Sequence, residues 1–212
     1  MRRLYLITND ADCPTERQLE RVVTHALAAG VTWVQFRTKA GANTPFPSVA
    51  ARIRVCEKLK KACDAAGALL FVNDDLALAE YCGTHLHLGQ SDTPLTDARS
   101  RLPAPILIGV TCHDQLALAQ TAVAQGANYV SFGACFPSPT KPHASSTDLG
   151  VFQRAKTLGV PTVAIGGITA HNAADVWKAG ADVLAVSHAI LRADDANTIT
   201  RVCKQILTAE HG

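Results

Sequence analysis

The sequence predicts an α/β protein built as a single (β/α)8 TIM barrel with parallel strands, and three observations lead to this prediction. Short runs rich in valine, isoleucine, leucine and aromatic residues recur, separated by stretches whose apolar residues repeat at spacings of three and four. The runs number eight, as in a closed barrel. A parallel neighbour requires a crossover long enough to contain a helix, so alternating strands and helices indicate parallel pairing.

Each predicted strand is a short apolar run that ends in, or is directly followed by, a polar, charged or glycine residue. In chain order the runs are residues 4–8 (LYLIT), 32–37 (TWVQFR), 69–73 (LLFVN), 84–88 (THLHL), 106–110 (ILIGV), 129–133 (YVSFG), 162–165 (TVAI) and 183–187 (VLAVS).

Amphipathic stretches between the runs predict the helices. Two of them end before a glycine, Gly30 and Gly180, at the position where a left-handed residue commonly ends a helix. The fourth and eighth helices have the least defined boundaries. The predicted helices are residues 17–29, 49–66, 94–101, 116–125, 149–158, 173–179 and 197–207, with a further helix beginning at residue 76.

The competing architecture is an open doubly wound sheet. Its dinucleotide fingerprint, GxGxxG after the first strand, is absent after residues 4–8. The chain also contains no linker, charge block or low-complexity stretch, and 212 residues fit one domain. We therefore expect a single catalytic domain over residues 1–212.

Composition limits the classes of partner. Apolar residues make up 48% of the chain and charged residues 18%, and the net charge of +2 is too small to indicate binding to nucleic acid or to a membrane surface. No run approaches the roughly 18 apolar residues of a membrane span, and the N-terminal apolar stretch is too short for a signal peptide. We expect a cytoplasmic protein, and the sequence leaves open whether it forms a homo-oligomer.

The seven cysteines are odd in number and form no CxxC pair, which argues against a disulfide framework and against a zinc site. We interpret them as buried thiols that fill space. Cys112 and Cys135 follow strand ends and could lie near a site, but packing is the favoured interpretation.

Polar and charged residues gather where the predicted strands end, which is the functional face of a barrel. Gln35, Arg37 and Lys39 are spaced two apart, so they project to one side of the second strand. Lys141 can add a third cation from residues 136–146 (FPSPTKPHASS), a long loop typical of a lid or binding segment. Cations that converge on one mouth indicate a polyanionic substrate, and a diphosphate suits them better than a lone carboxylate.

Asp74 and Asp92 come from adjacent units and are the carboxylates closest to those cations. Mg²⁺ is commonly held by one or two carboxylates together with substrate phosphate oxygens and water, so this pair predicts a magnesium site. The alternative is that Asp74 or Asp75 caps the helix that begins at residue 76. Because two aspartates follow Asn73, one can cap while the other binds.

Gly166, Gly167 and Ser187 predict a second anion site. In barrels the loops after the seventh and eighth strands frequently hold a phosphate with backbone N–H groups, and glycine permits the close approach. The histidines are less informative. His85 and His87 share one strand face but lack an evident third metal ligand, so a core role is favoured, whereas His113 either orients substrate or is structural.

Short motifs in register with the barrel units make the chain resemble thiamine phosphate synthases over almost its whole length. These motifs are residues 35–39 (QFRTK), 73–74 (ND), 87–92 (HLGQSD), 108–111 (IGVT), 132–133 (FG), 138–141 (SPTK), 164–168 (AIGGI) and 186–187 (VS). That family joins 4-amino-2-methyl-5-hydroxymethylpyrimidine diphosphate to a thiazole phosphate with Mg²⁺, which forms thiamine phosphate and pyrophosphate through a pyrimidine carbocation.

The resemblance implies a role for each matched residue. The diphosphate would be held by Arg37, Lys39, Asn73 and Lys141, and the metal by Asp74 and Asp92. The pyrimidine would contact Gln35 and Thr111, and the thiazole phosphate would be received by Gly167, Val186, Ser187, Ser138 and Thr140.

Some positions depart from the family pattern. Ser138 stands where threonine is usual and Thr111 where serine is usual, exchanges that retain a hydroxyl. Ala134 and Cys135 replace a proline-containing pair before the loop, which could alter the stiffness of the lid. Two alternatives stay open at this point, a thiazole tautomerase and a non-catalytic regulator that binds thiamine-related phosphates.

Overall fold

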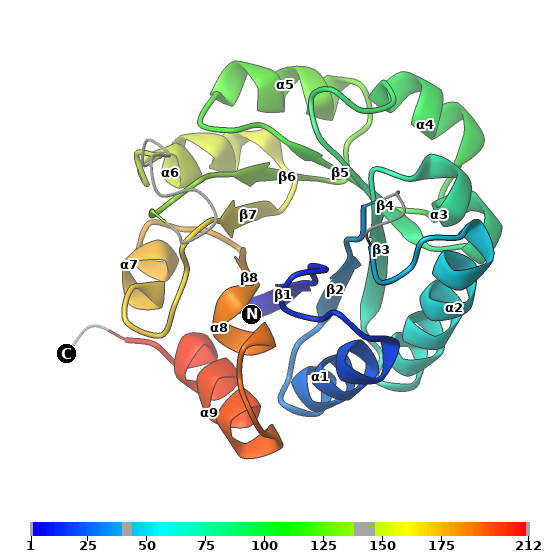
Figure 1. Ribbon diagram of the computed structural model, residues 1–212. Helices are drawn as coiled ribbons and strands as arrows, with labels where there is room; N and C mark the ends of the chain where they lie inside the picture. The colour runs from blue at the N-terminus through cyan, green and yellow to red at the C-terminus, as the bar shows by residue number, and fades with distance from the viewer. Residues whose placement is uncertain (1, 40–43, 138–146, 211–212) are drawn as a thin grey trace.

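The computed structural model describes residues 2–39, 44–137 and 147–210, and its centre is a closed barrel of eight parallel strands with helices around the outside (Figure 1). The strands are β1 (Arg3–Ile7), β2 (Trp33–Phe36), β3 (Leu69–Asn73), β4 (His85–Leu88), β5 (Ile108–Thr111), β6 (Tyr129–Phe132), β7 (Thr162–Ile165) and β8 (Val183–Val186). The helices are α1 (Glu16–Ala28), α2 (Val49–Ala65), α3 (Leu76–Cys82), α4 (Leu95–Arg101), α5 (Leu116–Ala124), α6 (Val151–Ala155), the 3-10 helix η1 (Lys156–Leu158), α7 (Ala173–Lys178), α8 (His188–Leu191) and α9 (Ala196–Leu207).

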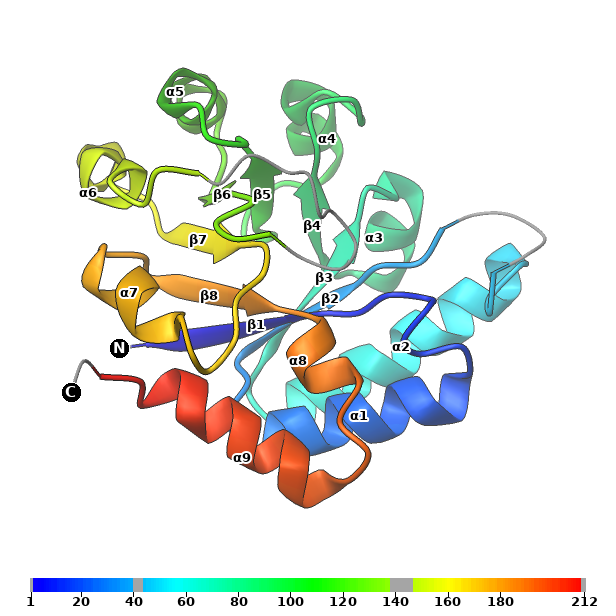
Figure 2. The same cartoon turned by 60° about the vertical axis from the view of Figure 1, so that its left-hand side comes forward.

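Each strand pairs in parallel with its neighbours in chain order, and the ring closes between β1 and β8, where Tyr5 lies opposite Ala185. The outer ring of helices closes in the same way, because the last helix, α9, packs beside the first, α1 (Figure 2). The closed ring confirms the predicted barrel over the open doubly wound sheet.

Apart from shifts of one residue at the ends of elements, the predicted elements and the structure differ in three places. β5 begins two residues later than the predicted run and extends to Thr111. The stretch predicted as one helix over residues 149–158 is α6 followed by η1, because its last turn tightens to 3-10 geometry before the left-handed Gly159. The four-residue α8 was not predicted, since it is too short to show helical periodicity. Gly30 and Gly180 have φ values of 99° and 96°, which confirms both predicted helix stops.

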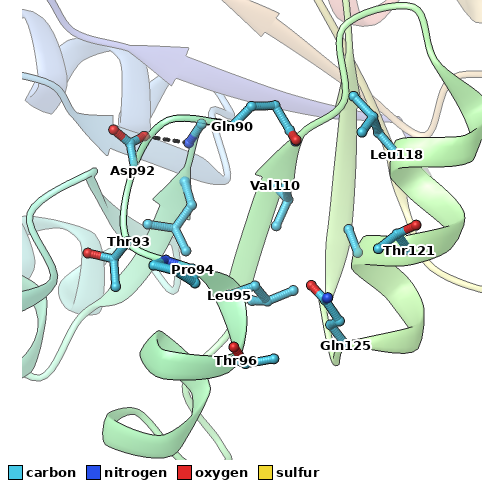
Figure 3. Close-up of a pocket in the computed structure, with 13 residues that line it drawn as sticks. Gln90, Asp92, Thr93, Pro94, Leu95, Thr96, Val110, Leu118, Thr121 and Gln125 are labelled. Carbon is cyan, nitrogen blue, oxygen red and sulfur yellow. Dashed lines mark hydrogen bonds between the residues drawn. The ribbon is translucent and has the colours of Figure 1, made fainter.

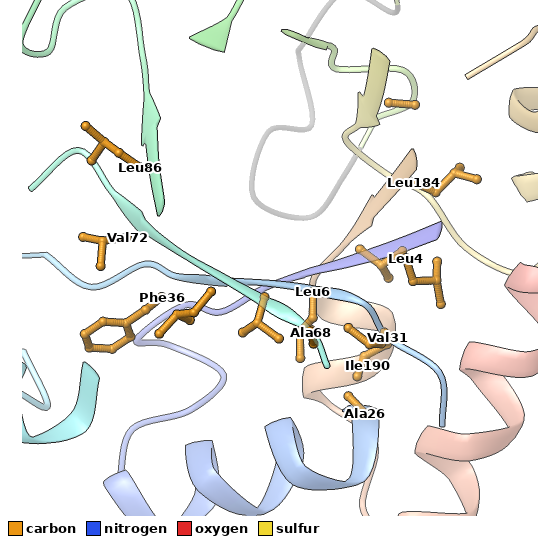
Figure 4. Close-up of a cluster of buried hydrophobic side chains, with 14 of the residues drawn as sticks. Leu4, Leu6, Ala26, Val31, Phe36, Ala68, Val72, Leu86, Leu184 and Ile190 are labelled. Carbon is orange, nitrogen blue, oxygen red and sulfur yellow. The ribbon is translucent and has the colours of Figure 1, made fainter. Parts of the chain in front are cut away.

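The strands carry two separate layers of side chains, one on each face. The outer layer fills the space between strands and helices and is apolar, as Figure 4 shows for Leu4, Leu6, Val72, Leu86 and Ile190. The inner layer fills the barrel and includes packed aromatic rings: Tyr5 and Trp33 meet edge to face with centroids 5.4 Å apart, and the tilted pair of Trp33 and Tyr129 has centroids 5.0 Å apart. The barrel is therefore a packed core, and a ligand meets it at the mouth where the strands end.

Within the described ranges, the helices are all too short or too polar to cross a membrane.

Candidate active site at the mouth of the barrel

The second strand follows the predicted alternation. Val34 and Phe36 lie in the outer layer, whereas Gln35 points into the barrel and its Nε2 donates to the Tyr5 hydroxyl at 2.8 Å. Gln35 is 2% exposed. The sequence therefore placed this amide correctly on the inner face.

Beyond the end of β2, Arg37 and Lys39 are exposed, so both charged side chains are accessible to a ligand. The backbone N–H of Arg37 donates to Thr8 Oγ1 at 3.0 Å, and that of Lys39 donates to Asp10 Oδ2 at 3.0 Å. Both contacts tie this segment to the loop after β1. The Arg37 charge also acts on Asp74, where it lowers the carboxyl pKa against larger opposing effects.

Asp74 and Asp92 converge, which brings together the two predicted metal ligands. Burial raises the pKa of Asp74 to about 6, and a hydrogen bond to Asp92 together with the charge of Asp92 adds to the rise. Two carboxylates this close repel when both are ionised, so a proton or a cation between them is stabilising. Asp74 also has a φ of 61°, a left-handed conformation that is uncommon for residues other than glycine.

The neighbouring aspartate takes the capping role. The Asp75 side chain accepts the N–H of Leu78 at 3.0 Å and caps α3, and it lies 3.2 Å from an Arg52 nitrogen. The prediction that one aspartate caps while the other stays available is confirmed for the cap. Asp74 is left to face Asp92.

Asp92 is oriented by the loop that carries it. The backbone N–H of Gly89 donates to its Oδ2 at 2.6 Å. A Cβ on Gly89 would lie 2.8 Å from the same oxygen, so glycine makes room for this contact. The carboxylate is thus fixed at the end of β4.

Thr111 is the last residue of β5 and is half-buried, with its Oγ1 2.9 Å from His87 Nε2. The other ring nitrogen of His87, Nδ1, lies 2.8 Å from the Tyr129 hydroxyl. Burial lowers the pKa of His87 to about 4, so the imidazole is neutral at physiological pH. Thr111 and Gln35, both expected at the pyrimidine, therefore lie at the two ends of one buried polar cluster.

The residues of the predicted second anion site lie at the ends of β7 and β8. Gly167 has a φ of 63°, and a Cβ there would lie 2.6 Å from the Pro137 carbonyl oxygen, so the position requires glycine on both counts. Ser187 precedes α8, and its Oγ accepts from Asn9 Nδ2 at 3.1 Å. Val186 is buried in the outer layer, so its side chain faces away from the mouth and its backbone alone is available to a ligand.

The predicted residues Ser138, Thr140 and Lys141 lie outside the described residues, as does most of the loop that carries them. Their expected roles stay predictions.

The structure gives local contacts for the two other histidines that the sequence analysis considered, and it leaves both interpretations of His113 open. His85 Nδ1 accepts from the Leu107 N–H at 3.0 Å, and its ring lies 5.1 Å from that of Phe71. His113 has a left-handed φ of 51°, and its carbonyl accepts from the Gly133 N–H. Among the residues described, no group of three or more histidine, cysteine or acidic side chains is placed to hold a metal.

The cysteines are free thiols, and all but the partly exposed Cys82 are buried. Burial raises the pKa of Cys112 and of Cys135 to about 12, so both are protonated and unreactive at neutral pH. This confirms that they act as packing residues.

A cavity of about 250 Å³ lies beside the barrel between α4 and α5 (Figure 3). It shares Gln90 and Asp92 with the mouth, but Leu95, Val110 and Leu118 supply much of its wall. Because the cations and Asp74 do not line it, we place the chemistry at the barrel mouth instead.

Sequence reasoning missed several polar residues near the site. Tyr5 and Tyr129 point into the barrel, a position that alternation along β1 and β6 could have revealed. Asp12 was also missed. It is buried, accepts from Asn9 and Arg192, and lies 3.4 Å from His188, so it braces the segment around Ser187.

Comparisons of sequence and of structure both find thiamine-phosphate synthases among the proteins that are similar to this chain. The family model described as thiamine monophosphate synthase matches residues 4–190. A thiamine-phosphate synthase of Thioalkalivibrio sulfidiphilus is 45% identical over 204 residues, 95% of this chain and 93% of its own. One from Chromobacterium violaceum is 43% identical over 199 residues, 93% and 92% of the two chains. Among solved structures, a thiamine phosphate pyrophosphorylase from Pyrococcus furiosus has a TM-score of 0.79 and 27% identity, with 96% and 93% of the chains covered.

Proposed function

Because this chain belongs to the thiamine monophosphate synthase family, we propose that it condenses 4-amino-2-methyl-5-hydroxymethylpyrimidine diphosphate with a thiazole phosphate at the barrel mouth. The products are thiamine phosphate and pyrophosphate. The convergence of Asp74 with Asp92, beside the Arg37 charge, is the observation that carries the proposal, because this arrangement suits a leaving diphosphate. We propose that residues 1–212 act together as one catalytic domain.

The bond that breaks joins the pyrimidine methylene carbon to the diphosphate oxygen, and its electron pair leaves with that oxygen. The pyrimidine ring stabilises the resulting carbocation, and the thiazole nitrogen then forms the new carbon–nitrogen bond. No nucleophilic side chain is required. The protein contributes preorganised charge where charge develops, as well as positioning and exclusion of water.

The side chains divide between the two substrates. We propose that Arg37, Lys39 and Lys141 act on the leaving diphosphate together with Asn73. Gln35 and Thr111 receive the pyrimidine. The thiazole phosphate is received by Gly167, Ser187 and the backbone of Val186, with the hydroxyls of Ser138 and Thr140.

Asp74 and Asp92 would hold Mg²⁺. Their fit rests on chemistry: two neighbouring carboxylates, one with a pKa raised to about 6 by burial and by the other, favour a cation between them. Two carboxylates are a typical protein contribution to Mg²⁺, whose other ligands are substrate phosphate oxygens and water. When bound, the ion neutralises charge on the diphosphate.

The test is release of pyrophosphate by the purified protein with both substrates and Mg²⁺. We expect product formation, and we expect Asp92→Asn to require more Mg²⁺ for half-maximal activity. Asp97→Asn, which changes an exposed aspartate on α4, is the matched control. Absence of pyrophosphate release in the wild type would contradict the proposal, and turnover of a thiazole isomer without the pyrimidine partner would indicate a tautomerase instead.

A further inference from the structure

A chain of hydrogen bonds crosses the interior of the barrel and joins Gln35 to Thr111. Gln35 Nε2 donates to the Tyr5 hydroxyl at 2.8 Å, and the Tyr5 and Tyr129 hydroxyls lie 3.0 Å apart. The Tyr129 hydroxyl is 2.8 Å from His87 Nδ1, and His87 Nε2 is 2.9 Å from Thr111 Oγ1. Each of these five residues comes from a different strand, namely β2, β1, β6, β4 and β5 in the order of the hydrogen bonds. The hydrogen-bonded chain therefore forms only when the barrel closes.

The surrounding residues hold this chain in place. Tyr5 and Tyr129 are each 1% exposed, and His87 stacks on Tyr129 with an interplanar angle of 20°. The Tyr129 ring lies directly over Gly109, where a Cβ would come within 1.9 Å of the ring. Since any side chain at Gly109 would displace the ring, the backbone of β5 is built to accommodate it.

The direction of each hydrogen bond follows from its neighbour. The Gln35 amide nitrogen is a donor, so the Tyr5 hydroxyl accepts from it and donates to Tyr129. The Tyr129 hydroxyl then donates to His87 Nδ1, which leaves the His87 proton on Nε2 and directed at Thr111. Thr111 Oγ1 accepts that proton and also accepts from the Ser131 hydroxyl at 3.4 Å, so its own hydroxyl proton is left to be donated to a ligand.

The opposite end has the complementary character. With its nitrogen donated to Tyr5, Gln35 keeps its Oε1 as an acceptor, and within the described part of the chain no group donates to that oxygen. If the Gln35 amide turned over, every hydrogen bond in the chain would reverse and the His87 proton would move to Nδ1. Thr111 would then become an acceptor toward the ligand, so the two ends change character together.

We propose that this buried chain sets the donor and acceptor polarity of the mouth, so that Gln35 accepts and Thr111 donates, and thereby selects an aminopyrimidine over its oxo counterpart. The inference rests on the proposed function. An aminopyrimidine edge has an amino donor beside a ring-nitrogen acceptor, whereas the oxo form has an acceptor beside a ring N–H donor. The oxo form therefore matches the reversed chain. Tyr5, Tyr129 and His87 are in this view positioning residues that act through Gln35 and Thr111.

The experiment compares kcat/KM for the aminopyrimidine diphosphate with kcat/KM for its 4-oxo analogue. We expect the wild type to prefer the amino substrate strongly, because a site built for a particular donor rejects a ring that leaves it unpaired. Tyr129→Phe and Tyr5→Phe each remove one link, which uncouples the ends, and we expect the preference to fall about tenfold or more. Tyr81→Phe, which removes an exposed tyrosine hydroxyl, leaves the preference unchanged.

Thr111→Val provides a second route that leaves the buried aromatic residues in place. We expect it to reduce the preference as Tyr129→Phe does, and we expect the double variant to lose little more than either single variant, because both interrupt the same chain. A preference that is unchanged in all three single variants, with both substrates slowed equally, would overturn the inference. So would a wild type without any preference.

The proposed function can fail separately. If the wild type releases no pyrophosphate from the amino substrate, the proposed reaction is wrong, and calorimetric binding of the two diphosphates still tests the chain. Tighter binding of the amino form in the wild type, lost in Tyr129→Phe, supports it. Equal affinities overturn it.

Discussion

Leu86 and His87 are neighbours on β4 that face opposite sides of the barrel wall, and the layers they enter differ in chemistry. Leu86 lies in the outer layer, which is filled by aliphatic and aromatic side chains (Figure 4). His87 enters the inner layer, where aromatic rings pack beside a chain of hydrogen bonds. The outer layer depends on volume, whereas the inner layer also depends on which atom donates and which accepts.

This difference separates stability from specificity. In the outer layer another apolar side chain of similar volume can replace a residue at small cost. In the inner layer an isosteric change such as tyrosine to phenylalanine retains the packing but removes a link between two groups at the mouth. The outer face of the eight strands thus stabilises the fold by packing against the helices. In the inference above, their inner face determines which groups at the mouth donate and which accept.

The largest expected effect comes from breaking the outer layer. Leu86→Ala removes a fully buried side chain, and we expect it to lower the free energy of unfolding by about 2–5 kcal/mol, measured by urea denaturation. The amino-to-oxo preference of the folded fraction should stay at the wild-type value. A loss of preference as large as that in Tyr129→Phe would show that the two layers are not separable.

The mouth itself gives the next largest effect. Arg37→Ala removes one preorganised positive charge beside Asp74, and we expect turnover to fall about 10²-fold or more. Thermal unfolding should be little changed, because the side chain is exposed. The matched control is Arg101→Ala, at the end of α4, where the exposed arginine pairs with Glu80. Normal turnover in Arg37→Ala would exclude a role for this residue in stabilising the leaving group.

The carboxylate pair predicts a dependence on pH. The pKa of Asp74 is raised to about 6, chiefly by burial and then by Asp92, so folding without metal is favoured at low pH and this contribution is lost as the pH rises through about 6. Metal binding has the opposite dependence, because it requires the ionised carboxylate. We expect affinity for Mg²⁺ with pyrophosphate to rise about tenfold from pH 5 to pH 7, measured by calorimetry.

Asp74→Asn is the matched variant for that measurement. It retains an oxygen ligand but removes the titrating group, so the residual affinity should be lower and should lose this pH dependence. An unchanged pH profile in Asp74→Asn would assign the proton to another group.

The fold was predictable from the sequence because each strand–helix unit shows its own hydrophobic pattern. Runs such as residues 69–73 and 162–165 match β3 and β7 to the residue, since an apolar strand between helices is readable from composition alone. The short α8 was missed because four residues show no periodicity.

The site was predictable where it lies close to a strand end, and less so where it depends on contacts across the barrel. Gln35 and Asp92 follow from alternation and from position, and the division of labour between Asp74 and Asp75 follows from the adjacent helix start. The hydrogen-bonded chain through Tyr5, Tyr129 and His87 depends on such contacts, since the two tyrosines are 124 positions apart in sequence. No local pattern encodes such a pairing, because it arises only when the ring of strands closes.

The smallest effect separates the two neighbouring aspartates at the end of β3. Asp75→Ala removes the cap of α3 and its contact with Arg52, and we expect a loss of about 1 kcal/mol in unfolding free energy with turnover unchanged. Asp75→Asn retains a capping oxygen and should lower the unfolding free energy by only a few tenths of about 1 kcal/mol. The partly exposed ion pair with Arg52, which this variant also removes, contributes little. The matched change at the preceding position, Asp74→Ala, should have the opposite signature, with lost turnover and no loss of the cap. If Asp75→Ala reduced turnover as much as Asp74→Ala does, the capping and binding roles would not be divided between these residues. The start of α3 would then be part of the site.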